Sequence, residues 1–301
     1  MRADLYHNIT QQIVHAIESG TKGTMSRLPW HSGREISLPC NAISKRRYRG
    51  INTLLLWVAA RQAGHPTGEW ATYRQWSAAS AQVRKGESAT VVLLWKPIDG
   101  RNVSDTDDDS PLQSRMLART FYVFNRAQVD GYSVDRKELA DCTRRESAER
   151  FFAAQPAAIW HGSDGAFFDP HSDTVSLPSF AAFVSADAYY SVYAHELTHW
   201  TGAKHRLDRD LSGRFGSEAY AMEELVAELG AAFTLGHLGL AATPRNDHAC
   251  YIKSWLDVLR SDTRAIVTAA ARSQAAADYL IAFAEPERLG TSTAAEHESA
   301  A

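Results

Sequence analysis

The sequence predicts an α+β fold in two domains, a small N-terminal α+β domain and a mainly helical C-terminal domain. Three observations predict it. A chain of 301 residues is long enough for two domains that each bury a core. Residues 1–98 carry 13 Lys and Arg against 5 Asp and Glu, whereas the rest carries 19 against 30, so the net charge changes from +8 to −11. The longest apolar, β-branched runs lie in the first half, and helical spacing dominates the second.

The N-terminal domain is expected over residues 1–132. The predicted elements are helices over 4–19, 53–64 and 70–81, and paired, buried strands over 89–95 and 119–125. The Gly-, Pro- and Arg-rich residues 21–52 lack helical spacing and are expected to form a long ordered loop. The acidic stretch between the two strands is interpreted as a flexible hairpin loop. Helices and strands thus alternate in this half of the chain.

A polar run at 132–145 is the expected boundary, with a surface helix as the alternative, and the second domain is expected over 145–285. Its predicted elements are a helix over 146–156, two short strands within 166–180, helices over 187–200 and 217–235, and one or two helices over 251–283. Residues 286–301 are expected to be a disordered tail. The second domain is therefore expected to be mainly helical.

The composition argues against a membrane protein and against a disulfide scaffold. No apolar run approaches the roughly 20 residues of a membrane span. The N-terminus lacks the charged start and apolar block of a secretion signal, so we expect a cytoplasmic protein with no membrane partner. The three cysteines are far apart and odd in number, which argues against disulfides and against a cysteine-based zinc site.

The segment SVYAHELTHWTG, residues 191–202, contains the pattern H-E-x-x-H. His195 and His199 are four residues apart, so both imidazoles lie on one face of a helix and can bind one metal ion. Glu196, about 100° around the helix, can take a proton from a water molecule at the metal. The pattern predicts a metal-dependent hydrolase that cleaves peptide bonds, with Glu196 as the catalytic base.

Two kinds of residue compete to be the third metal ligand. His205 completes the pattern H-E-x-x-H-x-x-G-x-x-H, in which a glycine turn returns a third histidine to the metal. Glu224, in YAMEELVAELGAAF, lies on a second helix whose small residues allow a close approach to another helix. Glu228, one turn later, would hydrogen-bond a ligand histidine or bind the metal itself. We favour Glu224 as ligand and Glu228 as orienting residue, and leave His205 open.

The basic N-terminal half interleaves cations with aromatic residues. Such a surface suits single-stranded nucleic acid, because cations follow the phosphates and rings stack on unpaired bases. The predicted DNA-binding residues are Lys45, Arg46, Arg47, Tyr48, Arg49, Trp70, Arg74, Trp76, Arg84 and Lys85. The alternative for each tryptophan is an ordinary place in the core.

The segments LPCNAISKRRYRGINTLLLW, GEWATYRQW, YAHELTHWTG and YAMEELVAELGAAF together resemble the ArdC-type antirestriction proteins of conjugative plasmids. The resemblance covers about residues 4–285. It implies a single-stranded DNA-binding domain joined to a zincin-like metallopeptidase domain that protects incoming plasmid DNA in the recipient. It also implies a divalent metal, Zn²⁺ or alternatively Mn²⁺, and a protein substrate of unknown identity. The alternative is a DNA-binding protection factor whose metal site is structural or vestigial.

Overall fold

The computed structural model describes residues 2–21, 28–31, 38–97, 116–132, 141–214, 216–243 and 248–285. The predicted hairpin loop between the two strands and the predicted tail at 286–301 lie outside the described residues. The predicted boundary at 132–145 does so in part, and α4 (Asp141–Ala153) begins within it. None of the described helices is both long enough and apolar enough to cross a membrane.

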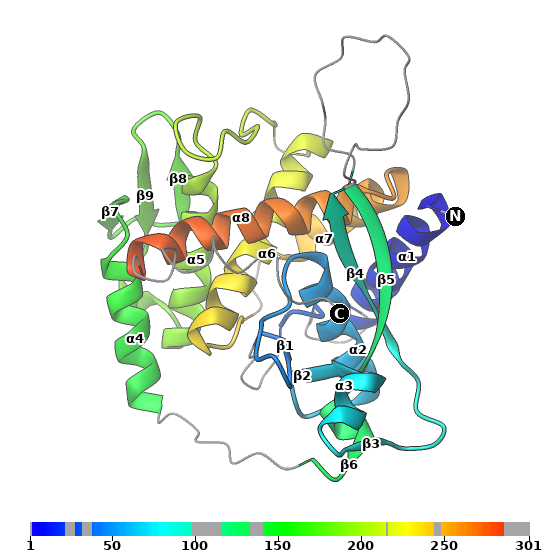
Figure 1. Cartoon of the computed structure of the whole chain (residues 1–301). Coiled ribbons are helices and arrows are strands. Elements are labelled where there is room, and N and C mark those ends of the chain that lie inside the picture. Colours follow the sequence, from blue (N-terminus) through cyan, green and yellow to red (C-terminus); the bar gives the residue numbers. More distant parts are fainter. Residues whose placement is uncertain are drawn as a thin grey trace.

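The N-terminal half places one mixed sheet beside two long helices (Figure 1). Its elements are α1 (Arg2–Gly20), β1 (Cys40–Asn41), α2 (Ile51–Ala63), β2 (Glu69–Thr72), α3 (Tyr73–Ala78), β3 (Gln82–Val83), β4 (Thr90–Pro97), β5 (Met116–Asn125) and β6 (Val129–Asp130). The sheet order is β1-β2-β5-β4, with β4 and β5 antiparallel as expected. The short strands β3 and β6 form a separate antiparallel pair.

The predicted helix over 70–81 is partly wrong. Residues 70–72 belong to β2 and pair with β5, because the Trp70 ring is fully buried against Leu56 and Val123. The helix starts only at Tyr73, where the Thr72 hydroxyl caps it by accepting a hydrogen bond from the Gln75 N–H. The long loop predicted over 21–52 contains the short strand β1, and the helix after it begins two residues early.

The two long strands are less buried than the sequence indicated. Val92, Leu93 and Val123 are buried, whereas Phe121 is 36% exposed and Tyr122 is 60% exposed. The apolar character of these strands therefore serves partly as core and partly as an exposed aromatic surface.

The C-terminal half is mainly helical, as predicted. Its further elements are β7 (Ala158–His161), β8 (Phe167–Asp169), β9 (Thr174–Leu177), α5 (Ala186–Thr201), α6 (Glu218–Leu238), α7 (His248–Ser261) and α8 (Ala265–Ala284). Helix α6 packs against α5, α7 and α8. The small sheet has the order β7-β9-β8, so β9, within the strand pair expected over 166–180, is central and β8 is an edge.

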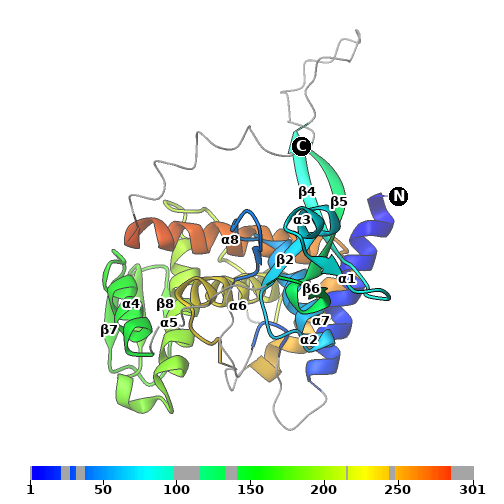
Figure 2. The same cartoon turned by 60° about the horizontal axis from the view of Figure 1, so that its bottom comes forward.

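The largest hydrophobic cluster contains residues of both halves, and two smaller clusters lie within the N-terminal half. Ile13 and Ile17 of α1 and Leu54 of α2 belong to the same buried cluster as Leu229 of α6 and Trp255 of α7. In both views α8 runs across the molecule from the side of β7–β9 to the side of β4 and β5 (Figure 1, Figure 2). Elements from both halves therefore surround α6, the helix that carries the acidic residues singled out in the sequence.

Candidate metal centre

Helices α5 and α6 form the platform of the site. Each begins at a serine whose hydroxyl accepts a hydrogen bond from a backbone N–H three residues later, Ser185 from Ala188 at 3.1 Å and Ser217 from Tyr220 at 3.2 Å. The two helices touch where Gly230 faces Thr198. Gly230, one of the small residues expected to allow a close helix approach, therefore lies at this contact.

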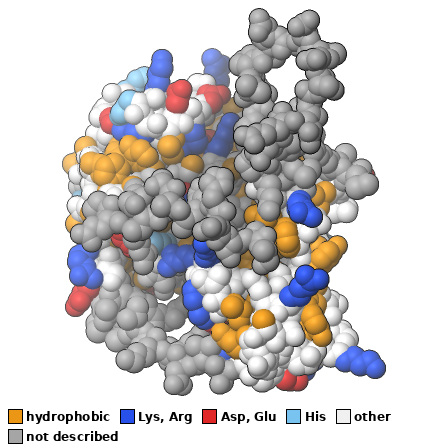
Figure 3. Space-filling model, viewed as in Figure 1, with side chains coloured by type: hydrophobic (Ala, Val, Ile, Leu, Met, Phe, Trp, Pro, Cys, Tyr) orange, Lys and Arg blue, Asp and Glu red, His pale blue; other side chains and the backbone are white. Residues whose placement is uncertain are grey.

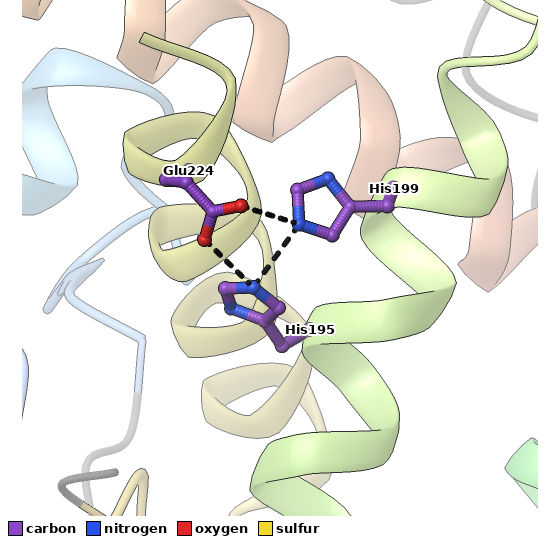
Figure 4. Close-up of side chains that lie close together, drawn as sticks. All are labelled: His195, His199 and Glu224. Atoms are coloured by element: carbon purple, nitrogen blue, oxygen red, sulfur yellow. Dashed lines mark hydrogen bonds and ion pairs between the residues drawn. The ribbon is translucent and has the colours of Figure 1, made fainter. Parts of the chain in front are cut away.

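Three side chains from these helices converge on one point (Figure 4). The Nε2 atoms of His195 and His199 are 3.1 Å apart. One oxygen of Glu224 lies 3.5 Å from His195 Nε2, and the other lies 3.5 Å from His199 Nε2. Among the described residues these three form the group whose donor atoms could hold one metal ion, and all three are largely buried.

The spacing of the three donor atoms fits a small divalent cation. Ligand atoms bound tetrahedrally to zinc at about 2.0–2.2 Å are about 3.3–3.6 Å from one another. The Nε2 atoms of His195 and His199 are 3.1 Å apart, close to that range, and each lies 3.5 Å from a different oxygen of the Glu224 carboxylate. Two imidazoles and one carboxylate are also a donor set that zinc favours.

The charges of the site are arranged for a cation. Burial disfavours a charged His199, but the carboxylates of Glu223 and Glu224 outweigh burial and raise the pKa of His199 to about 10. Burial likewise disfavours a charged Glu224, yet the two histidines hold its pKa well below the usual range. The cavity is thus negative enough to keep a proton on a ring that a metal ion would otherwise bind.

A carboxylate that sequence reasoning missed orients His199. Glu223 Oε1 lies 3.1 Å from His199 Nδ1, on the side of the ring away from Glu224. The Arg209 guanidinium donates to both oxygens of Glu223, at 2.9 and 3.0 Å. Charge pairing with His199 and Arg209 lowers the pKa of Glu223 despite its burial. The only feature of the sequence that could have indicated this role is that Glu223 directly precedes Glu224.

Glu228, expected to orient a ligand histidine, lies next to the ring of His195. Its Oε2 atom is 3.7 Å from His195 Nδ1, longer than a hydrogen bond, and this Nδ1 is buried without a hydrogen-bond partner. Its Oε1 atom accepts a hydrogen bond from Trp30 Nε1 at 3.0 Å and is 2.6 Å from His31 Nε2. No pattern in the sequence indicated these two N-terminal contacts.

His205 lies away from the other candidate ligands. Its side chain is 65% exposed, and its Nε2 atom is 3.5 Å from Asp173. The neighbouring Arg206 packs over the Trp200 ring and pairs with the same aspartate, so the turn after α5 is held outward. The structure thus brings Glu224, and not His205, to the two histidines.

A cavity of about 280 Å³ opens over the three donor atoms. Glu196 lines it, beside His195 and His199. Tyr220 also lines it, with its hydroxyl 3.2 Å from that of Tyr251. Tyr193, the other tyrosine near the motif, is instead buried against Phe152. The cavity therefore holds a potential base and a potential hydrogen-bond donor next to the donor cluster.

Two predicted DNA-binding residues are in the wrong place for that role. Trp70 and Trp76 are fully buried, and Trp76 Nε1 donates to the backbone oxygen of Phe124. Neither ring can stack on a base from inside the core. The alternative weighed for them, an ordinary place in the core, describes their position in the structure.

The other predicted residues are at the surface, and several are already paired. Lys45 and Arg84 lie within 4.0 Å of carboxylates, Tyr48 is half-buried, and Arg49 pairs with Asp278 of α8. The Arg47 guanidinium lies 2.6 Å from His237 Nδ1 of α6. Among the described residues, exposed cations without an ion pair include Arg46, Arg74 and Lys85.

The exposed aromatic residues of this half are different from the predicted ones. Tyr73 is 50% exposed and packs edge-on against Phe124. These two rings line a groove with Arg84 and Lys85. Figure 3 shows hydrophobic side chains and Lys or Arg side chains close together over the lower right of the molecule, where Figure 1 places β2–β6 and α3.

Comparison with protein families gives two matches along the chain. Residues 3–124 match the N-terminal domain of the anti-restriction factor ArdC. Residues 146–272 match a zincin-like metallopeptidase family. The second match includes the H-E-x-x-H segment and the acidic residues of α6, and the first includes Trp30 and His31.

Whole-chain relatives agree with these matches. The chain is 49% identical to the uncharacterized protein y4eC of Sinorhizobium fredii, over 92% of this chain and 91% of that protein. It is 36% identical to the Escherichia coli DNA primase TraC over 95% of this chain, but spans only 28% of the primase. The Mn(II)-bound crystal structure of antirestriction protein ArdC from plasmid R388 matches with a TM-score of 0.74 and 35% identity, over 93% of this chain and 98% of that one. Its metal-free structure gives 0.75 and 34%, over 94% and 98%.

Proposed function

The chain belongs to the ArdC family of antirestriction proteins, and on that premise we propose that it is a metal-dependent peptidase that binds single-stranded DNA. Its action would protect incoming plasmid DNA in a recipient cell. The observation that supports the peptidase most directly is the convergence of His195, His199 and Glu224 in a cavity lined by Glu196.

The three convergent residues would hold one divalent cation. Two histidines and a carboxylate suit zinc. The related ArdC protein has been solved with Mn(II) bound, so we propose Zn²⁺ or Mn²⁺ for this chain. Glu223 and Arg209 fix the His199 ring from behind, which favours one ring orientation before a cation arrives.

Peptide hydrolysis at this site needs a base and a group that stabilises negative charge. When bound, the cation supplies a Lewis acid that polarises the peptide carbonyl and makes water more acidic. Glu196 accepts the proton of the attacking water and passes it to the departing amine. The Tyr220 hydroxyl donates a hydrogen bond to the carbonyl oxygen as charge develops there. Burial raises the pKa of Tyr220, so its hydroxyl keeps this proton at neutral pH.

Strand β8 offers the substrate a place to lie. It is an edge strand, and its Phe167 and Phe168 line the cavity. An extended peptide can pair with such an edge through its backbone. Because Phe167 is 50% exposed, a peptide with an apolar side chain near the cleaved bond would gain contact area there.

The basic half supplies the proposed DNA surface. Exposed Tyr73 and Tyr122 present rings on which unpaired bases can stack. Arg74 and Lys85 lie exposed nearby in sequence and can contact phosphates. Duplex DNA hides its base faces, so this combination favours single strands. A peptidase held on single-stranded DNA would cut a protein bound to, or acting on, that DNA.

Conjugative transfer of a plasmid into restricting and non-restricting recipients tests the peptidase proposal. Glu196→Gln keeps the shape of the side chain and removes the base. We expect this variant to lose protection in the restricting recipient, with unchanged transfer into the non-restricting one. Full protection by Glu196→Gln would overturn the peptidase proposal and leave DNA binding, with a structural metal site, as the function.

A further inference from the structure

The turn at residues 28–31 from the N-terminal half reaches the helix that carries the candidate metal site. Trp30 and His31 are 0% and 2% exposed, and both contact the Glu228 carboxylate, which is 5% exposed. Glu228 is 198 positions from Trp30 and 197 positions from His31 in the chain. A buried carboxylate requires hydrogen-bond donors, and the N-terminal half provides two of them here.

The hydrogen bonds define which nitrogen of His31 carries its proton. The Leu28 backbone N–H donates to His31 Nδ1 at 3.3 Å. Nδ1 therefore acts as the acceptor, and Nε2 carries the hydrogen and donates to Glu228 Oε1 at 2.6 Å. Trp30 Nε1 donates to the same oxygen at 3.0 Å. Both donors act on Oε1, which turns Oε2 toward His195.

Helix α2 holds this turn in place. The Arg61 guanidinium donates to the backbone oxygens of Leu28, at 2.7 Å, and of His31, at 3.1 Å. The backbone of the turn is thus bound to α2, while its Trp30 and His31 side chains bind Glu228 of α6. This attachment gives the two donors a defined position relative to Glu228.

His195 lacks a hydrogen bond on the side of its ring that faces Glu228. Its Nδ1 atom is buried without a hydrogen-bond partner, and Glu228 Oε2 is 3.7 Å away. A histidine that binds a metal through Nε2 carries its proton on Nδ1, and an acceptor there orients the ring. Glu228 Oε2 is placed to become that acceptor.

We infer that Trp30 and His31 are positioning residues of the metal centre. They hold Glu228 so that its second oxygen can accept a hydrogen bond from the Nδ1–H of His195 when a divalent cation is bound. The inference rests on the proposed function only in requiring that the site binds such a cation. It means that the metal affinity of the zincin-like part depends on side chains of the ArdC N-terminal part.

Trp30→Phe in the full chain, with Trp57→Phe as matched control, tests the inference. Both indoles belong to the same core, but Trp57 Nε1 is buried without a hydrogen-bond partner, so its replacement leaves Glu228 alone. The affinity for Zn²⁺ is measured by competition with a chromogenic chelator. We expect Trp30→Phe to weaken it about 10-fold or more and Trp57→Phe to leave it near the wild-type value.

The visible spectrum of the Co²⁺-loaded protein separates positioning from general destabilisation. It is expected to change in Trp30→Phe and His31→Leu, and to remain as in wild type in Trp57→Phe. His31→Gln, which restores an N–H donor, should recover part of the affinity lost in His31→Leu. Equal affinities and spectra for Trp30→Phe and Trp57→Phe would overturn the inference, whereas a wild-type protein that binds no divalent cation would instead overturn the proposed function.

Discussion

Gly230 of α6 lies so close to Thr198 of α5 that a Cβ atom at this glycine would be 2.5 Å from the threonine Cγ2 atom. No side chain fits at that distance. The contact brings together the two helices that carry the histidines and the acidic residues of the candidate metal site, so the site depends on the absence of a side chain at position 230.

Gly230→Ala is expected to push α5 and α6 apart. Overpacking of this kind costs about 1–3 kcal/mol of folding stability, and metal affinity should fall because Glu224 moves from the histidines. Thermal unfolding and Zn²⁺ titration measure the two effects. Adding Thr198→Ala removes the closest atoms and should restore part of the folding stability and part of the metal affinity. Gly165→Ala serves as the neutral control, because a Cβ atom at that position would meet open space.

Replacing the proposed third ligand should separate it from the earlier alternative. Glu224→Ala is expected to lower metal affinity by more than about 100-fold, beyond the 10–100-fold typical of residues that only orient ligands. His205→Ala should leave affinity unchanged, because that side chain is 65% exposed and away from the cavity. Metal content after dialysis distinguishes them, and retention of metal by Glu224→Ala would contradict the assignment.

Metal binding should strengthen as pH rises. Carboxylates raise the pKa of His199 to about 10 in the metal-free protein, so this ring holds a proton at pH 7. A cation must displace that proton, which predicts a roughly tenfold gain in affinity per pH unit between about pH 7 and 9. Calorimetric titration in buffers of different ionisation enthalpy should show about one proton released per metal ion.

The same raised pKa has the opposite effect on the metal-free fold. A group whose pKa is raised on folding adds stability that is complete below its unfolded value near 6.5 and is lost as pH rises toward 10. The metal-free protein should therefore become less stable over this window while the metal-loaded protein does not. Denaturant unfolding at several pH values with and without Zn²⁺ checks this difference.

Single-stranded DNA binding should depend on exposed rings. Tyr73→Ala and Tyr122→Ala are each expected to cost about 1–3 kcal/mol, or about 5–150-fold in affinity for a single-stranded oligonucleotide. Arg74→Ala should reduce the salt dependence of binding. Trp76→Phe is the contrasting variant, since its buried ring should affect stability and not affinity. Fluorescence anisotropy at two salt concentrations measures all four, and an unchanged affinity in both tyrosine variants would exclude this surface.

The parts of the site predicted from sequence are those fixed by local geometry. His195 and His199 share a helix face whatever surrounds them, and the alanines and glycine around Glu228 indicated a close helix contact. Glu223 and the Trp30–His31 contacts with Glu228 depend on tertiary packing between distant segments, which spacing alone does not encode. Trp70 and Trp76 were misplaced for a related reason, because composition does not reveal which ring faces the core.

The core shared by both halves also bears on inheritance. The chain matches the TraC primase over 95% of its own length, although it spans 28% of that protein. If α1 and α2 were separated from α6 and α7, apolar side chains such as Ile13, Leu54 and Trp255 would be exposed to water. Either half alone would thus be less stable than the two together. The packing gives a physical reason for the match to TraC to include both halves.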